Sequence, residues 1–169
     1  MKILGTLALI IIALILHTTL FDLIAIGGVR PDLLLIILVL LSLRGGSITG
    51  TLVGFIIGFF QDLYSPEMFG LNALTKSIVG YLLGLNKDRV YWGSFPVQAQ
   101  IIFFSVLFHD FAYFLIYSFY SVSTFLRFML VQALPTALYS AVIGPVVYKL
   151  FGLIGRVERD NGSRVISVK

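Results

Sequence analysis

Few ionisable residues lie in or beside the apolar segments of this chain, and their spacing suggests an ion pair. The stretch GFFQDLYSPEMFGLNAL at 58–74 holds Asp62 and Glu67, and Lys76 follows just inside the next apolar run. We expect the Lys76 ammonium to reach the carboxylate of Asp62 or of Glu67. The alternative is that Lys76 extends to the nearest water and that Asp62 only caps a helix end.

A second ionisable pair, His109 and Asp110, falls in the middle of the apolar run 96–119. Ionisable groups inside such a run mark a functional site by default. Neighbouring helical positions point in different directions, so we do not expect the two side chains to share one partner. The chain has two histidines and no HxxxH spacing, which argues against a metal site. We expect both groups to be satisfied inside a helical bundle or by a partner span.

Catalytic motifs are not found in the sequence. It contains no nucleophile paired with a base and no paired carboxylates at helical spacing. The segment GSITG has neither the lysine nor the strand context of a nucleotide-binding loop. We therefore expect no enzymatic activity and no cofactor.

The composition places the chain in a lipid bilayer. Its 169 residues are 59% hydrophobic and 12% charged, whereas a soluble domain carries about 25% charged residues. We predict an integral membrane protein with no separate soluble domain. The net charge of +4 is modest and does not indicate nucleic-acid binding. The absence of cysteine excludes disulfides.

The apolar runs predict an all-α bundle of six transmembrane helices over residues 1–155, followed by a short, flexible, polar tail at 156–169. The first run has no clear cleavage site and is interpreted as a retained span. Arg44 and the Gly45–Gly46 pair separate the second span from the third. Merging these two spans would place Arg44 in mid-membrane, where inserting its charge costs about 2.5–3.5 kcal/mol. The predicted spans are 3–20, 31–43, 46–61, 69–86, 96–119 and 126–153.

The Lys and Arg residues of the connecting loops predict the orientation. With six spans, one set of loops holds Lys2, Arg44, Lys87, Arg89, Arg156, Arg159, Arg164 and Lys169, and the other holds Arg30 and Arg127. Cytoplasmic loops are enriched in Lys and Arg, so both termini are expected in the cytoplasm. Asp32, Asp62 and Glu67 are then expected at the outer side.

Small residues recur along the third and fourth predicted spans. Stripes of small residues allow close backbone approach between helices in lipid. We therefore predict that these spans pack against each other or against their neighbours. The segment QDLYSPEMFG would form the external turn between them. The two stripes are Gly46, Gly50, Gly54 and Gly58, which Asp62 continues, and Ala73, Ser77, Gly80 and Gly84.

The last predicted span contains two prolines, Pro135 and Pro145. Proline removes a helical hydrogen bond, so a kinked or broken helix is expected there. Broken helices occur at transporter substrate sites, but simple kinks are far more common.

Three segments together resemble the MreD family, the small membrane subunit of the bacterial rod-shape system. They are RPDLLLIILVLLSLRGG at 30–46, GTLVGFIIGFFQDLYS at 50–65 and FGLNALTKSIVGYLLG at 69–84. The second half of the chain adds little to the likeness. The matching positions are Pro31, Asp32, Gly54, Gly58, Asp62, Gly70, Ala73, Leu74, Gly80, Tyr81 and Gly84.

This resemblance implies a non-catalytic scaffold in the bacterial cytoplasmic membrane that supports peptidoglycan synthesis and cell shape. It implies MreC as the direct partner, in an elongasome with the MreB filament, the RodA polymerase and its transpeptidase partner. It also implies a fold similar to the S component of energy-coupling-factor transporters. If so, we expect the MreC membrane helix to lie in a groove with close backbone approach, and Gly54→Leu or Gly58→Leu to weaken the complex. Which helix face forms the groove is left open. Whether the chain self-associates is left open.

A transporter S component that binds a vitamin is the alternative function. It would also be a small six-span bundle with small-residue faces. A substrate pocket needs several convergent polar groups. Outside the tail, the external half offers mainly Asp62, Glu67, Asn72, Lys76 and Arg127.

Overall fold

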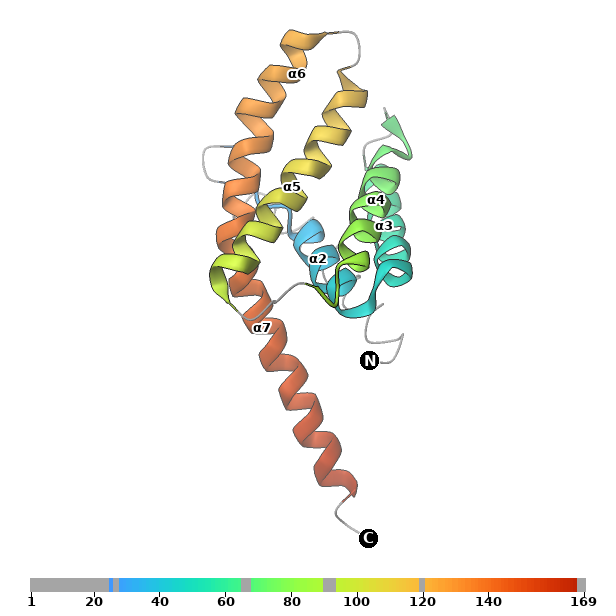
Figure 1. The fold of residues 1–169 in the computed structure, drawn as a ribbon, viewed down its shortest axis with the longest axis vertical. Coiled ribbons are helices and arrows are strands. Elements are labelled where there is room, and N and C mark those ends of the chain that lie inside the picture. The colour runs from blue at the N-terminus through green and yellow to red at the C-terminus, as the bar shows by residue number, and fades with distance from the viewer. Residues whose placement is uncertain (1–24, 26–27, 65–67, 90–93, 119–120, 167–169) are drawn as a thin grey trace.

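The computed structural model describes residues 25, 28–64, 68–89, 94–118 and 121–166, with side chains up to residue 150 (Figure 1). The predicted all-α fold is confirmed for these residues, whereas the first predicted span, 3–20, lies outside them. The helices are α2 (Leu33–Gly45), α3 (Ser47–Asp62), α4 (Leu71–Leu85), α5 (Phe95–Tyr117), α6 (Val122–Phe128), the π-helix η2 (Met129–Ala133) and α7 (Leu134–Ile166).

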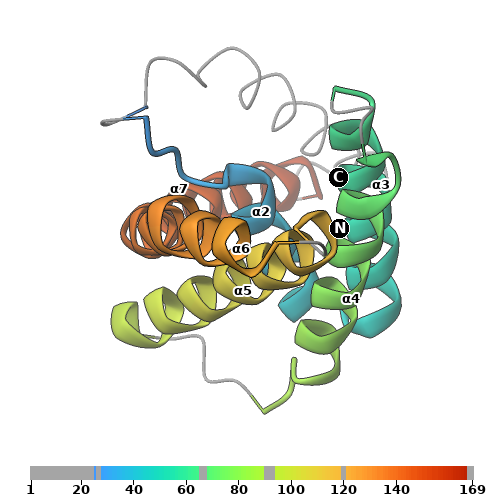
Figure 2. The same cartoon turned by 90° about the horizontal axis from the view of Figure 1, so that it is seen from above.

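Helix α2 is the centre of the fold. Every residue from Leu34 to Ser42 is buried, and Figure 2 shows α2 between the α3–α4 pair and the group formed by α5, α6 and α7. A helix that is apolar on all sides is stable only when it is surrounded. One cluster joins Leu38 of α2 to Ile57 of α3, and a second joins Val39 of α2 to Ile102 of α5.

The turn between α2 and α3 depends on Gly46. Its φ of 86° lies in the left-handed region, which a side chain disfavours. Its N–H donates to the Ser42 carbonyl at 2.8 Å and closes the end of α2. The guanidinium of Arg44 lies 5.6 Å from the ring centre of Tyr148 on α7. The two helices therefore separate where the sequence predicts a break.

Helices α3 and α4 pack with their backbones in direct contact. A Cβ added at Gly50 would overlap the Gly80 carbonyl, and one added at Gly54 would overlap the Lys76 carbonyl. The same contact joins Gly58 to Ala73 and Gly84 to Gly46. Such close approach gives dense dispersion contacts, which drive helix association in lipid.

This packing leaves no open groove for a partner helix along Gly54 and Gly58. The space in front of both glycines is filled by the α4 backbone at Asn72, Ala73, Lys76 and Ser77. A helix of another protein therefore cannot reach them while α3 and α4 stay together.

Within the described part of the chain, two helical stretches, Phe95–Tyr117 and Val122–Leu150, are long and apolar enough to cross a bilayer. Helices α2, α3 and α4 have 13, 16 and 15 residues, which is below the usual length of about 20. On α3, Leu52 and Phe55 are more than half exposed. Apolar side chains exposed on this scale are what a lipid-facing surface requires.

The last helix is longer than the sequence predicts. It was expected over 126–153, but the chain is helical from Val122 through η2 and α7 to Ile166. Most of the 156–169 segment is therefore helical. Figure 1 shows the end of α7 projecting beyond the bundle.

The two prolines of this helix have different surroundings. The π-helix ends at Ala133, two residues before Pro135, and the Leu134 N–H donates to the Met129 carbonyl, five residues back. Because Pro135 has no N–H, the normal ladder is interrupted at this point, and a wider turn accommodates the ring. The chain stays helical through Pro145, so the helix is not broken there.

Candidate functional site: a buried charge network beside a cavity

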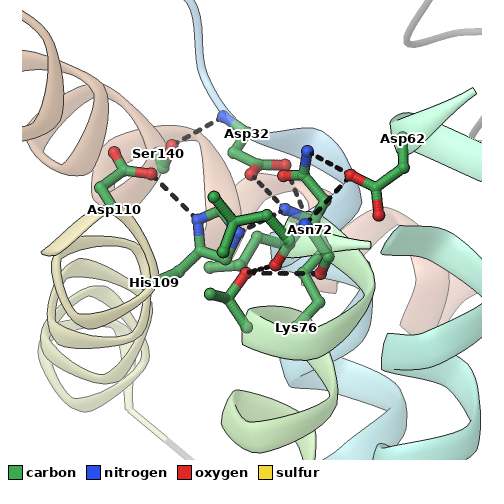
Figure 3. A network of polar contacts seen from close by, with 10 residues as sticks. Asp32, Asp62, Asn72, Lys76, His109, Asp110 and Ser140 are labelled. Carbon is green, nitrogen blue, oxygen red and sulfur yellow. Dashed lines mark hydrogen bonds and ion pairs between the residues drawn. The ribbon is translucent and has the colours of Figure 1, made fainter. Parts of the chain in front are cut away.

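Lys76 is fully buried at the centre of a polar network (Figure 3). Its Nζ lies 3.2 Å from Oδ2 of Asp32 and 3.0 Å from Nε2 of His109. A buried ammonium needs such partners because its desolvation is costly. The predicted pair with Asp62 is therefore wrong, and so is the alternative that Lys76 extends to water. The other predicted partner, Glu67, lies outside the described residues.

Asp32 connects three helices. It is the N-cap of α2, and its Oδ1 accepts the Leu35 N–H at 2.8 Å. Its own backbone N–H donates to the Ser140 hydroxyl of α7 at 2.9 Å. Its second carboxylate oxygen accepts from Lys76 of α4. A carboxylate at a helix N-terminus satisfies free N–H groups and is favoured by the helix dipole.

The contacts of His109 determine which ring nitrogen carries its proton. An ammonium has only donors, so Nε2 must accept from Lys76. The ring proton is then on Nδ1, which donates to Oδ1 of Asp110 at 3.0 Å. The two neighbouring side chains thus contact each other, and they share no third partner among the described residues, as the sequence predicts. Their satisfaction within the bundle agrees with the sequence-based expectation.

Asp62, at the end of α3, caps the N-terminus of α4. Its Oδ1 accepts the backbone N–H and the side-chain amide of Asn72, both at 3.0 Å, and its Oδ2 accepts the Ala73 N–H at 3.0 Å. The N-cap residue of α4 is Gly70, which has no side chain to do this. The structure therefore bears out the capping alternative, with the cap supplied to the following helix.

We predict that Asp62→Ala destabilises the protein by about 2 kcal/mol, because it leaves two buried backbone N–H groups without an acceptor. Hydrogen exchange at the Asn72 and Ala73 amides is expected to accelerate strongly. Exchange at Val106, in the middle of α5, serves as the internal control. Unchanged protection of the two capped amides would contradict this assignment.

A cavity of about 660 Å³ lies beside the network. Asp32, His109 and Asp110 line it, so the network forms part of its wall. No sequence pattern indicates that Arg30, Gln61 and the α5 tyrosines meet there, because they come from separate elements. These tyrosines are Tyr113 and Tyr117, and the remaining lining residues are Gly28, Val29, Pro31, Tyr64, Met68, Asn72, Phe114, Phe128, Val131, Gln132 and Thr136.

The other motif residues lie apart from the network. Pro31 is buried on the cavity wall, and Tyr81 is 48% exposed on the outer face of α4. Ser77 donates to the Ala73 carbonyl within α4 at 2.6 Å. Among the described residues, no group of three or more His, Asp or Glu side chains is placed to hold a metal ion.

The network holds α2, α4, α5 and α7 together at one level of the bundle. Asp32 and His109 satisfy the Lys76 ammonium, so the direct effect of the network is to fix the positions of these helices and to build one wall of the cavity. The turn at Gly46 and the α3–α4 contact fix the other side of the bundle. These features together make a compact helical frame with an apolar outer surface.

A comparison with protein families finds a match to the family described as rod shape-determining protein MreD, over residues 1–155. Searches of curated proteins and of solved structures each found no match. The matched range includes the whole network, the cavity wall and both apolar stretches long enough to span a bilayer. The chain is therefore a membrane protein that belongs to the MreD family of rod shape-determining proteins.

Proposed function

We propose that this protein is a non-catalytic scaffold of the bacterial elongation machinery. It binds MreC in the cytoplasmic membrane and supports lateral peptidoglycan synthesis, in a complex with RodA, its transpeptidase partner and MreB. The observation that carries the proposal is the family match over residues 1–155. The apolar surface of the helical frame gives such a scaffold its sites of contact with other membrane helices.

We further propose six membrane spans with both termini in the cytoplasm, in a bundle similar to a transporter S component. Arg44 and Lys87 support this orientation. Arg44 is at the end of α2, and the Lys87 side chain lies against Gly46 in the next turn. Asp32 and Asp62 lie at the opposite ends of α2 and α3. Positive charge at one end and carboxylates at the other favour a cytoplasmic position for the Arg44 end.

Single cysteine variants test the orientation, because the chain has no native cysteine. We expect Tyr64→Cys and Ser123→Cys to react with a membrane-impermeant maleimide added to intact spheroplasts. Asp88→Cys is expected to react only after the membrane is opened. All three positions are exposed in the structure. The reverse labelling pattern would contradict the proposed topology.

The partner helix must use an exposed face, because the glycine stripe of α3 is covered by α4. One exposed face consists of a row on α3, in which Phe55 and Phe59 stack at 6.1 Å. Another is a row on α7 at every fourth residue. The rows are Ile48, Leu52, Phe55 and Phe59 on α3, and Leu134, Leu138, Val142, Val146 and Leu150 on α7.

A photo-crosslinking amino acid placed at one position of each face identifies the contact. Leu52 on α3, Phe104 on α5 and Val142 on α7 are suitable because each is more than half exposed. Ile57, which is fully buried, is the control. We expect one face to crosslink to MreC in the native membrane and Ile57 to give no such product. Equal labelling from every face would argue against a defined scaffold interface.

The cavity favours one alternative function, the substrate-binding S component of an energy-coupling-factor transporter. Its volume of about 660 Å³ lies within the range of about 300–1,000 Å³ that is common for small-molecule sites. Its walls carry convergent polar groups, among them Asp32, Gln61 and His109.

Gentle detergent purification of the tagged chain from its own host, followed by mass spectrometry, separates the two functions. A single-span protein with an external domain, together with wall polymerases, is the result expected for the scaffold. A pair of ATPases with a membrane coupling subunit would overturn it in favour of the transporter. A strain that expresses the untagged chain is the control for nonspecific recovery.

A further inference from the structure

One wall of the cavity is built from aromatic rings. Tyr113 stacks on Tyr117 with 6.1 Å between ring centres and 13° between planes. Phe114 stacks on Phe128 of α6 at 4.9 Å, and Tyr117 meets Phe128 edge-on at 5.7 Å. These four residues all line the cavity. They present a continuous set of rings to whatever occupies it, and aromatic faces attract cations.

Asp110 places a carboxylate on the same wall. One of its oxygens accepts from His109, and this is its only polar contact with the described residues. The nearby ammonium of Lys76 contacts Asp32 and His109 instead. The Asp110 side chain is 15% exposed, and Asp110 lines the cavity. Its negative charge therefore has no Lys or Arg partner in the described part of the chain.

Gln61 adds an unused acceptor. Its side-chain oxygen is buried and has no hydrogen-bond partner among the described residues, and Gln61 lines the same cavity. A buried acceptor left without a donor is destabilising. This oxygen is covered in the structure, so a ligand N–H or O–H group reaches it only when the Gln61 side chain rotates toward the cavity.

We propose that the cavity binds an organic ammonium group, which is held between the Asp110 carboxylate and the aromatic wall. The lining combines a carboxylate, an unused amide oxygen and stacked rings, and all three favour a positively charged donor attached to an apolar body. Arg30 also lines the cavity. Its charge repels cations, so the lining favours at most one ammonium group on the ligand. This chemistry is available from a free amine or from the headgroup of an ethanolamine phospholipid.

Binding is measured with the purified full chain in a neutral detergent, by calorimetry and by thermal unfolding. Phenethylamine is the cationic probe, and phenethyl alcohol is its uncharged counterpart of similar shape. Dihexanoyl phosphatidylethanolamine and dihexanoyl phosphatidylglycerol form the second pair and test the lipid source. In one or both pairs, we expect the ammonium compound to bind about tenfold more tightly than the compound without an ammonium group. The reason is that the positive charge supplies the selectivity. Preference only in the lipid pair identifies a phospholipid headgroup as the source.

Two variants locate the binding site. Asp110→Asn keeps the side-chain shape but removes the charge, and it is expected to abolish the preference for the amine. Tyr117→Leu removes one ring without touching the charge network, and it is expected to weaken amine binding several-fold. Asp88→Asn is the matched control, since Asp88 is exposed and does not line the cavity. The Asp88→Asn variant is expected to bind each probe with the same affinity as the unmodified protein.

Equal binding of the amine and its neutral partner in both pairs would overturn the proposal, as would an undiminished preference in Asp110→Asn. Because these measurements use the isolated chain, they do not depend on MreC. A failure here leaves the scaffold function intact, and a failure of the partner experiments leaves the cavity proposal intact.

Discussion

Gly54→Ala is expected to destabilise the protein by about 2–3 kcal/mol, although alanine is the better helix former. In an isolated helix this change would stabilise by up to about 1 kcal/mol. Here the new Cβ would overlap the Lys76 carbonyl of α4. The overlapping atom belongs to the backbone and cannot rotate away, so the two helices must move apart. Separation also loses the contacts at Gly50 and Gly58, and Gly54→Leu is expected to prevent stable folding.

Thermal and denaturant unfolding in detergent measures this effect. Leu52→Phe is the control, because Leu52 lies on the same helix but is 59% exposed, so added bulk there points outward. We expect the control to unfold at the same temperature and denaturant concentration as the unmodified protein. If Gly54→Ala were as stable as the control, the close α3–α4 contact would be disproved. If the variant is destabilised as expected, loss of MreC from a Gly54 variant is a result of misfolding and not of a blocked groove.

Lys76→Met is expected to destabilise the protein by about 3 kcal/mol, within the range measured when one partner of a buried ion pair is removed. Methionine has nearly the same length, so the effect isolates the charge. The substitution leaves Oδ2 of Asp32 and Nε2 of His109 without their donor. Lys87→Met, on an exposed loop, is the matched control and is expected to change stability by less than about 0.5 kcal/mol.

A double-mutant cycle identifies the partner of Lys76. Combining Lys76→Met with Asp32→Asn is expected to cost about 1–3 kcal/mol less than the sum of the single changes, because the two residues contact each other. The combination with Asp62→Asn is expected to be nearly additive. A large coupling to Asp62 and none to Asp32 would reverse the assignment of the network.

Much of the architecture followed from the sequence, because it depends on local patterns. Composition indicates the bilayer, since so few charges cannot cover a water-exposed surface. The Gly45–Gly46 pair predicts the break between α2 and α3, because Gly46 adopts a left-handed φ. The four-residue spacing of small residues predicts close helix packing, since such residues fall on one helix face. Only the structure shows that the glycine stripe of α3 packs against α4 and is covered by it.

The partners of the charged residues were decided by the tertiary structure. Lys76 is 44 residues from Asp32 and 33 from His109 in the chain, so no local spacing encodes these contacts. Asp62 was closer in sequence, but its oxygens satisfy the free N–H groups at the start of α4. The cavity is also decided by the tertiary structure, because its wall joins residues from the segment before α2 and from α3, α4, α5 and the last helix. Helix periodicity specifies which residues share a face, whereas the crossing of the helices decides which faces meet.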